Sequence, residues 1–125
     1  MVCTQGGNGM LGPPVSAELS KPDSGVVMTV TDINPPPDSA PTLQLPHKSE
    51  ILSITDAEGV AALAEESDAI VNCAVMRPDR RLAFSVNVQG TYNAISAAAA
   101  AGHRRFINTG ARNATYLVPA VLSLC

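Results

Sequence analysis

Residues 1–12, MVCTQGGNGMLG, open the chain with a short apolar run and then place Gly6, Gly9 and Gly12 in G-x-x-G-x-x-G spacing. A backbone without Cβ atoms lets a pyrophosphate approach closely. Gly6 therefore suits a tight turn from strand to helix, Gly9 a phosphate contact and Gly12 close packing of the helix on the strand. A helix that begins there adds free N–H groups and the positive end of its dipole. The spacing predicts a dinucleotide-binding turn, although three glycines alone also occur at this spacing in ordinary turns.

An acidic residue follows at the matching distance. Residues 26–32, VVMTVTD, form a β-branched apolar run that predicts a buried strand ending at Asp32, twenty residues after Gly12. An acid at the end of the second strand of a βαβ unit accepts hydrogen bonds from the adenosine ribose hydroxyls and repels a 2′-phosphate. No Arg or Lys lies between Ile33 and His47, which favours NAD over NADP. The alternative is that Asp32 is a solvated turn acid before Asn34.

Composition limits the kind of protein. The chain has 125 residues and a net charge of −3, and its eight basic residues form no long run, so one domain is expected and nucleic acid is not an expected partner. No basic and apolar leader and no run of membrane-spanning length is present, which predicts a cytoplasmic protein without a membrane partner. Cys3, Cys73 and Cys125 are odd in number and fit neither a metal site nor a disulfide framework, so reduced thiols and no metal are expected.

Strands and helices alternate along the chain. Strands are expected at about 1–5, 26–32, 49–54, 69–75 and 105–109, and helices at about 10–20, 56–66 and 81–101, with a proline-rich surface loop at 33–46. Alternation of this kind predicts an α/β fold, a Rossmann-type parallel sheet of five strands in the order 3-2-1-4-5 with helices on both faces. Pro13 and Pro14 fall near the end of the first helical turn and Pro22 follows it, so this first helix is expected to be short or distorted.

The helix at 81–101 has the clearest periodicity. An apolar series recurs on one face at the spacing of an amphipathic helix, and Gly102 follows as a natural C-cap. The opposite edge carries Asn87 and Thr91. The members of the apolar series are Phe84, Val88, Tyr92, Ile95 and Ala99.

These segments together resemble the N-terminal half of the NAD-dependent epimerase/dehydratase family, the extended short-chain dehydrogenase/reductases. The glycine segment is similar to T-G-G-x-G-F-[IL]-G, with Gln5 in place of threonine. Residues 54–56 resemble the family's G-D-[IL] motif after the third strand, and residues 68–75 resemble the strand D-x-V-[IV]-H-L-A-A. Residues 86–93 resemble the motif N-V-x-G-T-x-N, and residues 105–109 resemble the strand [KR]-R-F-V-x-[ST]. The resemblance covers about residues 2–109.

The resemblance implies an NAD site. In this site Asp56 is the aspartate that meets the adenine amino group, and Cys73 stands at the strand end beside the nicotinamide ribose. Cys73 itself is expected to act through small size and not through thiol chemistry. Asn87 is expected to support the site, the alternative being a surface amide. The implied cofactor-binding residues are Gly6, Gly9, Met10, Leu11, Gly12, Asp32, Asp56, Ala57, Cys73, Ala74, Val75, Asn87 and Thr109.

The chain also departs from the family. Catalysis there needs a hydroxyl after the fifth strand and a Tyr-x-x-x-Lys pair, in which lysine lowers the pKa of tyrosine. Here Gly110 and Ala111 follow Thr109, and Ala120 stands four places after Tyr116. No catalytic residue is therefore assigned, and the chain alone is expected to be inactive.

The expected organisation is an incomplete NAD(P)-binding Rossmann domain at 1–110 with a divergent tail at 111–125. Three functions stay open. The chain is the NAD-binding portion of an oxidoreductase that acts, when complete, on a nucleotide sugar or a related hydroxyl substrate, or it is a non-catalytic NAD-binding regulatory module, or it is an inactive partial gene product. The expected partners are the dinucleotide and, for a complete parent, a small-molecule substrate, with a homodimer left open.

Overall fold

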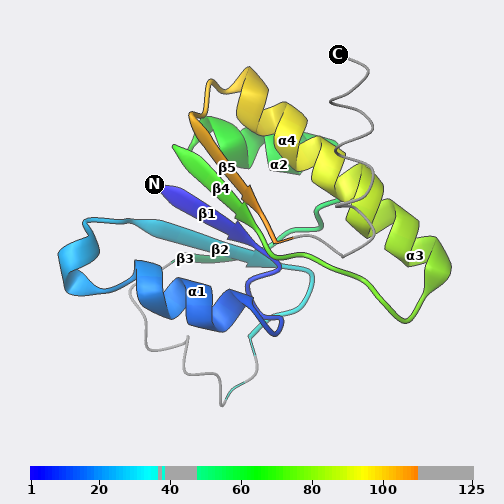
Figure 1. Ribbon diagram of the computed structural model, residues 1–125, viewed down its shortest axis with the longest axis horizontal. Coiled ribbons are helices and arrows are strands. Elements are labelled where there is room, and N and C mark those ends of the chain that lie inside the picture. Colours follow the sequence, from blue (N-terminus) through cyan, green and yellow to red (C-terminus); the bar gives the residue numbers. More distant parts are fainter. Residues whose placement is uncertain (37, 39–47, 110–125) are drawn as a thin grey trace.

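A five-stranded parallel sheet forms the centre of the molecule in the computed structural model, which describes residues 1–36, 38 and 48–109 (Figure 1). The strand order is β3-β2-β1-β4-β5. The strands are β1 (Val2–Gln5), β2 (Met28–Asp32), β3 (Lys48–Ile51), β4 (Ala69–Asn72) and β5 (Arg105–Asn108). The predicted fold class and strand order are confirmed. The strands β3 and β4 end three residues earlier than expected, which leaves residues 52–54 and 73–75 as connections above the sheet.

Helices cover both faces of the sheet. Figure 1 shows α1 (Gly12–Leu19) on one face, and α2 (Ala57–Glu65) with α4 (Thr91–Ala100) on the other. A short 3₁₀ turn, η1 (Pro22–Ser24), follows α1. The segments α3 (Arg80–Phe84) and η3 (Ser85–Gly90), the latter a π-helical turn, lead directly into α4. None of the helices formed by the described residues is long and apolar enough to cross a membrane.

The first helix is short, as predicted, but its prolines do not distort it. The helix α1 begins at Gly12, so Pro13 and Pro14 stand in its first turn and not at the end of that turn. The N–H groups of a first turn have no partner within a helix, so proline breaks no hydrogen bond of the helix there and its fixed φ suits the helix, although Pro13 and Pro14 offer no N–H to a ligand. The predicted start near residue 10 was therefore two residues too early.

The core lies between the sheet and the pair α2 and α4. Its buried members include Cys3, Val60, Leu63 and Ile70. Burial raises the pKa of the Cys3 thiol to about 12, with a smaller opposing effect from its hydrogen bond to Thr31. Cys3 is therefore a neutral packing residue at physiological pH.

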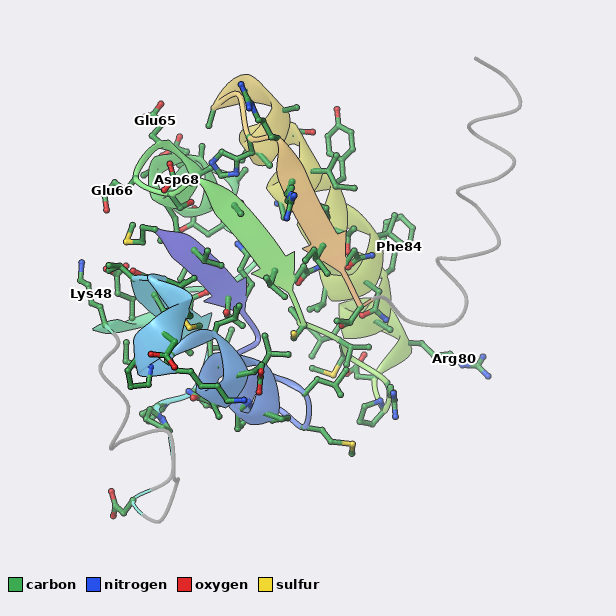
Figure 2. All side chains as sticks on the ribbon, turned by 60° about the vertical axis from the view of Figure 1, so that its left-hand side comes forward. Lys48, Glu65, Glu66, Asp68, Arg80 and Phe84 are labelled. Carbon is green, nitrogen blue, oxygen red and sulfur yellow. The ribbon has the colours of Figure 1, made fainter. Side chains whose placement is uncertain are left out.

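The predicted long helix is present, but its large apolar residues face solvent. Phe84 is 59% exposed and Tyr92 70% exposed, and Figure 2 shows the Phe84 side chain on the outer side of the helix. The face turned to the core carries Gly90, Ala94, Ala97 and Ala98. A Cβ on Gly90 would lie 2.4 Å from a methyl group of Ile54, so only small residues allow this approach.

The end of α4 confirms the predicted glycine cap. Gly102 has a φ of +75°, and the N–H groups of Gly102 and His103 donate to the carbonyls of Ala99 and Ala98 at 3.1 and 2.9 Å. This is the Schellman arrangement, in which a left-handed glycine turns the chain back over the last carbonyls.

Three parts of the sequence-based prediction lie outside the described residues. They are the boundary between residues 1–110 and 111–125, the tail with Ala111, Tyr116 and Ala120, and most of the loop 33–46.

Candidate cofactor site

A crevice of about 440 Å³ opens at the carboxyl ends of the strands. In an open parallel sheet, ligands bind at the point where the connections that follow two neighbouring strands lie on opposite faces of the sheet. Here these two neighbouring strands are β1 and β4. The volume is in the range of small-molecule sites. The crevice is lined by Gln5, Gly6, Gly9, Met10, Leu11, Asp32, Ile33, Asn34, Leu52, Ser53, Ile54, Cys73, Ala74, Val75, Met76, Arg77 and Val86.

The glycine turn forms one wall of the crevice and leaves no room for side chains at Gly6, Gly7 and Gly12. Gly6 has a φ of +67°, and a Cβ there would lie 2.6 Å from the backbone of Ala74. A Cβ on Gly12 would lie 2.2 Å from the carbonyl oxygen of Gly7, so Gly12 packs tightly against the turn. The Cβ of a residue at position 9 would meet only the Gly6 oxygen, at 3.4 Å. Gly9 therefore leaves its surface open to a ligand.

Asp32 links the turn to the end of β2. One carboxylate oxygen accepts the Asn8 N–H at 3.0 Å and the other accepts the Asn34 N–H at 3.1 Å. A carboxylate offers about four lone-pair positions, so two hydrogen bonds leave capacity for a ligand hydroxyl. Asp32 is half-buried at the crevice and is a structural residue of the turn, not a free surface acid.

Asn87 supports the connection that follows β4. Its amide oxygen accepts the Met76 N–H at 2.9 Å, and its amide nitrogen donates to the Met76 carbonyl at 2.8 Å. These two hydrogen bonds have the same pattern as a pair of hydrogen bonds between neighbouring strands. They fix the backbone beside Ala74 and Val75, which line the crevice. Asn87 does not line the crevice, but it is half-buried and both groups of its amide are paired with Met76, so it holds this connection and is not a solvated surface amide.

Asn72 fixes the base of the same connection. Its amide nitrogen donates to Asn108 Oδ1 at 3.0 Å and to Thr91 Oγ1 at 3.3 Å, while its amide oxygen accepts the Ala74 N–H at 3.0 Å. Thr109 donates from both its N–H and its hydroxyl to the Asn72 carbonyl. The predicted residue Thr109 therefore lies behind the crevice wall, beside Cys73.

The predicted site residues fall into three groups, of which two belong to the crevice. Gly6, Gly9, Met10, Leu11, Asp32, Cys73, Ala74 and Val75 all line the crevice, and Gly12, Asn87 and Thr109 support it. Burial raises the pKa of the Cys73 thiol, which agrees with a packing role.

Asp56 and Ala57 lie apart from the crevice lining. Asp56 is the N-cap of α2, where its carboxylate accepts the Gly59 N–H at 3.0 Å, and Ala57 is the first residue of that helix. The connection after β3 contributes Leu52, Ser53 and Ile54 to the crevice instead. A contact of Asp56 with an adenine amino group stays a prediction.

The sequence reasoning missed several lining residues, among them Gln5, Leu52 and Ile54. Gln5 was noted only as a departure from threonine. Arg77 lines the crevice, whereas Figure 2 shows Arg80 extending away from the protein. The described residues hold no cluster of three or more metal-ligating side chains.

Replacing Asn87 with leucine is expected to lower the free energy of unfolding by about 1–3 kcal/mol, because two hydrogen bonds are lost and both polar groups of Met76 lose their partner. Urea denaturation measures the loss, and hydrogen exchange of the Met76 amide should become faster. Gln89→Leu, at an exposed amide on the same π-helical turn, is the matched control. Unchanged protection of Met76 in Asn87→Leu would contradict the assigned role.

Comparison with solved structures agrees with this geometry. A short-chain dehydrogenase/reductase superfamily protein from Agrobacterium tumefaciens with bound NAD is 27% identical, with a TM-score of 0.70 over 86% of this chain and 31% of that chain. The enzyme WbmG from Bordetella bronchiseptica in complex with NAD and UDP gives a TM-score of 0.73 at 23% identity, covering 86% and 36%. UDP-glucose-4-epimerase from Stenotrophomonas maltophila with bound NAD and formylated UDP-arabinopyranose gives 0.71 at 21% identity, covering 86% and 35%.

The chain thus spans less than two fifths of the length of these structures. No curated protein matches it in sequence. The family model for the NAD dependent epimerase/dehydratase family matches residues 2–117, which include every strand and helix described above. Because this match covers most of the sequence, the chain belongs to the NAD-dependent epimerase/dehydratase family.

Proposed function

We propose that this chain binds NAD in the crevice, as the cofactor-binding part of an oxidoreductase or epimerase that acts on a nucleotide sugar or a related hydroxyl compound. The observation that carries the proposal is the joint placement of the glycine turn and the Asp32 carboxylate on one crevice at the ends of β1, β2 and β4. The bound nicotinamide would supply hydride acceptance and donation. The residues of this chain hold and orient the dinucleotide.

The fit between crevice and dinucleotide can be followed from residue to residue. Gly9 leaves open backbone for the pyrophosphate, and the first turn of α1 supplies the positive end of a helix dipole. Asp32 has lone pairs for the adenosine ribose hydroxyls. Its negative charge opposes a 2′-phosphate, so NAD is preferred to NADP. The nucleotide-sugar part of the proposal draws on the relatives crystallised with UDP and with a UDP-sugar.

The test is calorimetric titration with NAD and NADP. Asp32→Ala is expected to weaken NAD binding by about 10- to 150-fold, the equivalent of hydrogen bonds to a charged group worth about 1.5–3 kcal/mol. The substitution should also remove most of the preference of the protein for NAD over NADP. Asp79→Ala is the control, because the Asp79 carboxylate likewise accepts two backbone N–H groups but lies outside the crevice lining. Tighter binding of NADP than NAD by the wild type would overturn the assignment of Asp32.

A second candidate is a module that binds NAD without turning over a substrate. It concerns this chain alone, in which Ser96 stands four places after Tyr92 and Ala120 four places after Tyr116, so no Tyr-x-x-x-Lys pair occurs in the given residues. We expect no NADH formation by this chain with a panel of nucleotide sugars and other hydroxyl substrates. Absorbance at the NADH band measures it, with Tyr116→Phe as the control. Turnover that Tyr116→Phe abolishes would contradict the expectation.

The same proposal includes a cytoplasmic location. Cys3 and Cys73 are both unpaired and buried thiols among the described residues, and unpaired cysteines are typical of a reducing compartment. Location of a tagged chain by fluorescence microscopy tests this part separately.

A further inference from the structure

The connection from β3 to α2, residues 52–56, forms the wall of the crevice next to Asp32. Leu52, Ser53 and Ile54 of this connection line the crevice. The Leu52 N–H donates to the Asp32 carbonyl at 2.9 Å, so the wall begins at the strand end that carries the proposed ribose-binding carboxylate. The position of this wall therefore determines how much room the adenosine half of a dinucleotide finds beside Asp32.

Hydrogen bonds within the connection determine its shape but not its place. The hydroxyl oxygens of Ser53 and Thr55 lie 2.7 Å apart, and the Asp56 N–H donates to the Ser53 carbonyl at 3.0 Å. The Asp56 carboxylate in turn accepts the Gly59 N–H at the start of α2. All of these bonds join residues close together in the sequence, so they close a turn without attaching that turn to a distant part of the chain.

Asn93 of α4 supplies the distant attachment. Its amide nitrogen donates to the Ile54 carbonyl at 3.1 Å, across 39 positions of the sequence. Among the described residues, this is the one hydrogen bond that reaches residues 53–56 from outside the connection and α2. Gly90, one helical turn before Asn93, packs against the Ile54 side chain, which is 6% exposed. The same helical stretch therefore holds Ile54 by its carbonyl and by its side chain.

Asn87 offers a parallel on this helical stretch. Its amide holds Met76 in the connection after β4, while Asn93 holds Ile54 in the connection after β3. Both asparagines are half-buried, and neither lines the crevice. Each amide therefore acts on the crevice through the backbone of a wall and not through direct contact with a ligand.

Resting on the proposed function, we propose that Asn93 is a positioning residue for the adenosine half of the bound dinucleotide. Its hydrogen bond keeps the connection at the distance from Asp32 that the adenosine requires. Without this donor the Ile54 carbonyl turns toward water, since an unpaired polar group in the interior is costly. That turn moves Leu52 and Ile54 at the crevice, whereas the wall formed by the connection after β4 keeps its place through Asn87.

Separate titration of the two halves of NAD tests this role. Asn93→Leu removes the amide donor and keeps the branched shape of the side chain, and the higher helix propensity of leucine keeps α4 intact. This variant should bind NAD and AMP about 3- to 10-fold more weakly than the wild type, the effect of one lost hydrogen bond. Nicotinamide mononucleotide should bind as it does to the wild type. Calorimetric titration with NAD, and displacement of NAD by each mononucleotide, give the three dissociation constants.

Ser67→Ala is the matched control. Ser67 is buried at the other end of α2, where its hydroxyl donates to the Leu63 carbonyl at 2.9 Å. The helices α2 and α4 lie side by side on one face of the sheet (Figure 1), so this variant loses a comparable hydrogen bond in the same layer without touching the connection. It should lower the free energy of unfolding and keep the affinity for AMP. Asn93→Ala removes the same donor and repeats the test if leucine does not fit, because alanine has the highest helix propensity.

The outcomes separate the role of Asn93 from the proposed function. A wild type that binds no NAD overturns both. A wild type that binds NAD, together with unchanged AMP binding in both Asn93 variants, overturns the role of Asn93 and leaves the function standing. Equal weakening of AMP and nicotinamide mononucleotide, or weakening of AMP by Ser67→Ala, would show that lost stability acts on the whole site, and either result likewise overturns the role of Asn93.

Discussion

Replacing Gly6 with alanine is expected to lower the free energy of unfolding by about 2–5 kcal/mol and to abolish NAD binding. The positive φ alone costs a residue with a Cβ about 1–2 kcal/mol. The contact at 2.6 Å with the backbone of Ala74 adds the cost of overpacking, about 1–3 kcal/mol. The new methyl group also pushes the turn away from the end of β4, which is the wall of the crevice.

The chain contains its own control for this substitution. Gly25 has nearly the same φ, +64°, but a Cβ there would meet nothing within 4 Å. Gly25→Ala should therefore show the cost of the φ alone, about 1–2 kcal/mol, and keep NAD affinity. Urea denaturation of both variants with calorimetric titration measures the difference. Equal destabilisation by the two substitutions would show that Ala74 yields to the new methyl group.

The second large effect is a loss of stability in alkaline solution that depends on Cys3. The folded-state pKa of Cys3 is raised from the ordinary 9.0 to about 12 by burial. Between these values the unfolded chain releases the thiol proton and the folded chain keeps it, so the folded state binds more protons. Stability is then fully present below about pH 9 and falls as pH rises toward 12. Over the whole window the loss amounts to about 4 kcal/mol.

Urea denaturation at pH 8 and pH 11 tests this directly. The wild type should lose about 2–3 kcal/mol more than Cys3→Ala between these two values, because only the wild type has the thiol to ionise. The comparison of differences cancels the titration of tyrosines and lysines, which both proteins share. Parallel losses in the two proteins would show that Cys3 ionises in the folded state.

The sequence predicted the sheet well because local patterns determine it. The β-branched run ending at Asp32 and the glycine spacing before it each specify a strand end and a turn, and both lie at one crevice. Strand order followed from the alternation of strands and helices and the general rules for parallel sheets. The identity of most crevice residues near the glycine turn was predictable for the same reason.

The face of the long helix was harder to interpret. Periodicity identified Phe84, Val88 and Tyr92 as one face, but the buried face is the one with Gly90 and Ala94. Area burial favours large residues at a core contact, whereas close approach to Ile54 admits only small ones. Which effect dominates depends on the distance between helix and sheet, and a single sequence does not contain that distance.

The connection after β3 was harder to predict for a similar reason. The motif around Asp56 indicated the start of α2, while the early end of β3 brings Leu52 and Ile54 to the crevice. Where β3 ends depends on its pairing with β2, and a single sequence does not contain that pairing. The contact of Asp56 with an adenine amino group stays a prediction.

The π-helical turn at Ser85–Gly90 has a consequence for how the chain tolerates insertions and deletions. A π turn holds one residue more than an α turn, and Asn87 reaches Met76 from within it. Deleting Ser85, which does not line the crevice, would remove the extra residue of the π turn and change where Asn87 lies relative to Met76. The contacts along this helix therefore depend on a single extra residue, and shortening the segment changes the site even when every side chain that lines the site is kept.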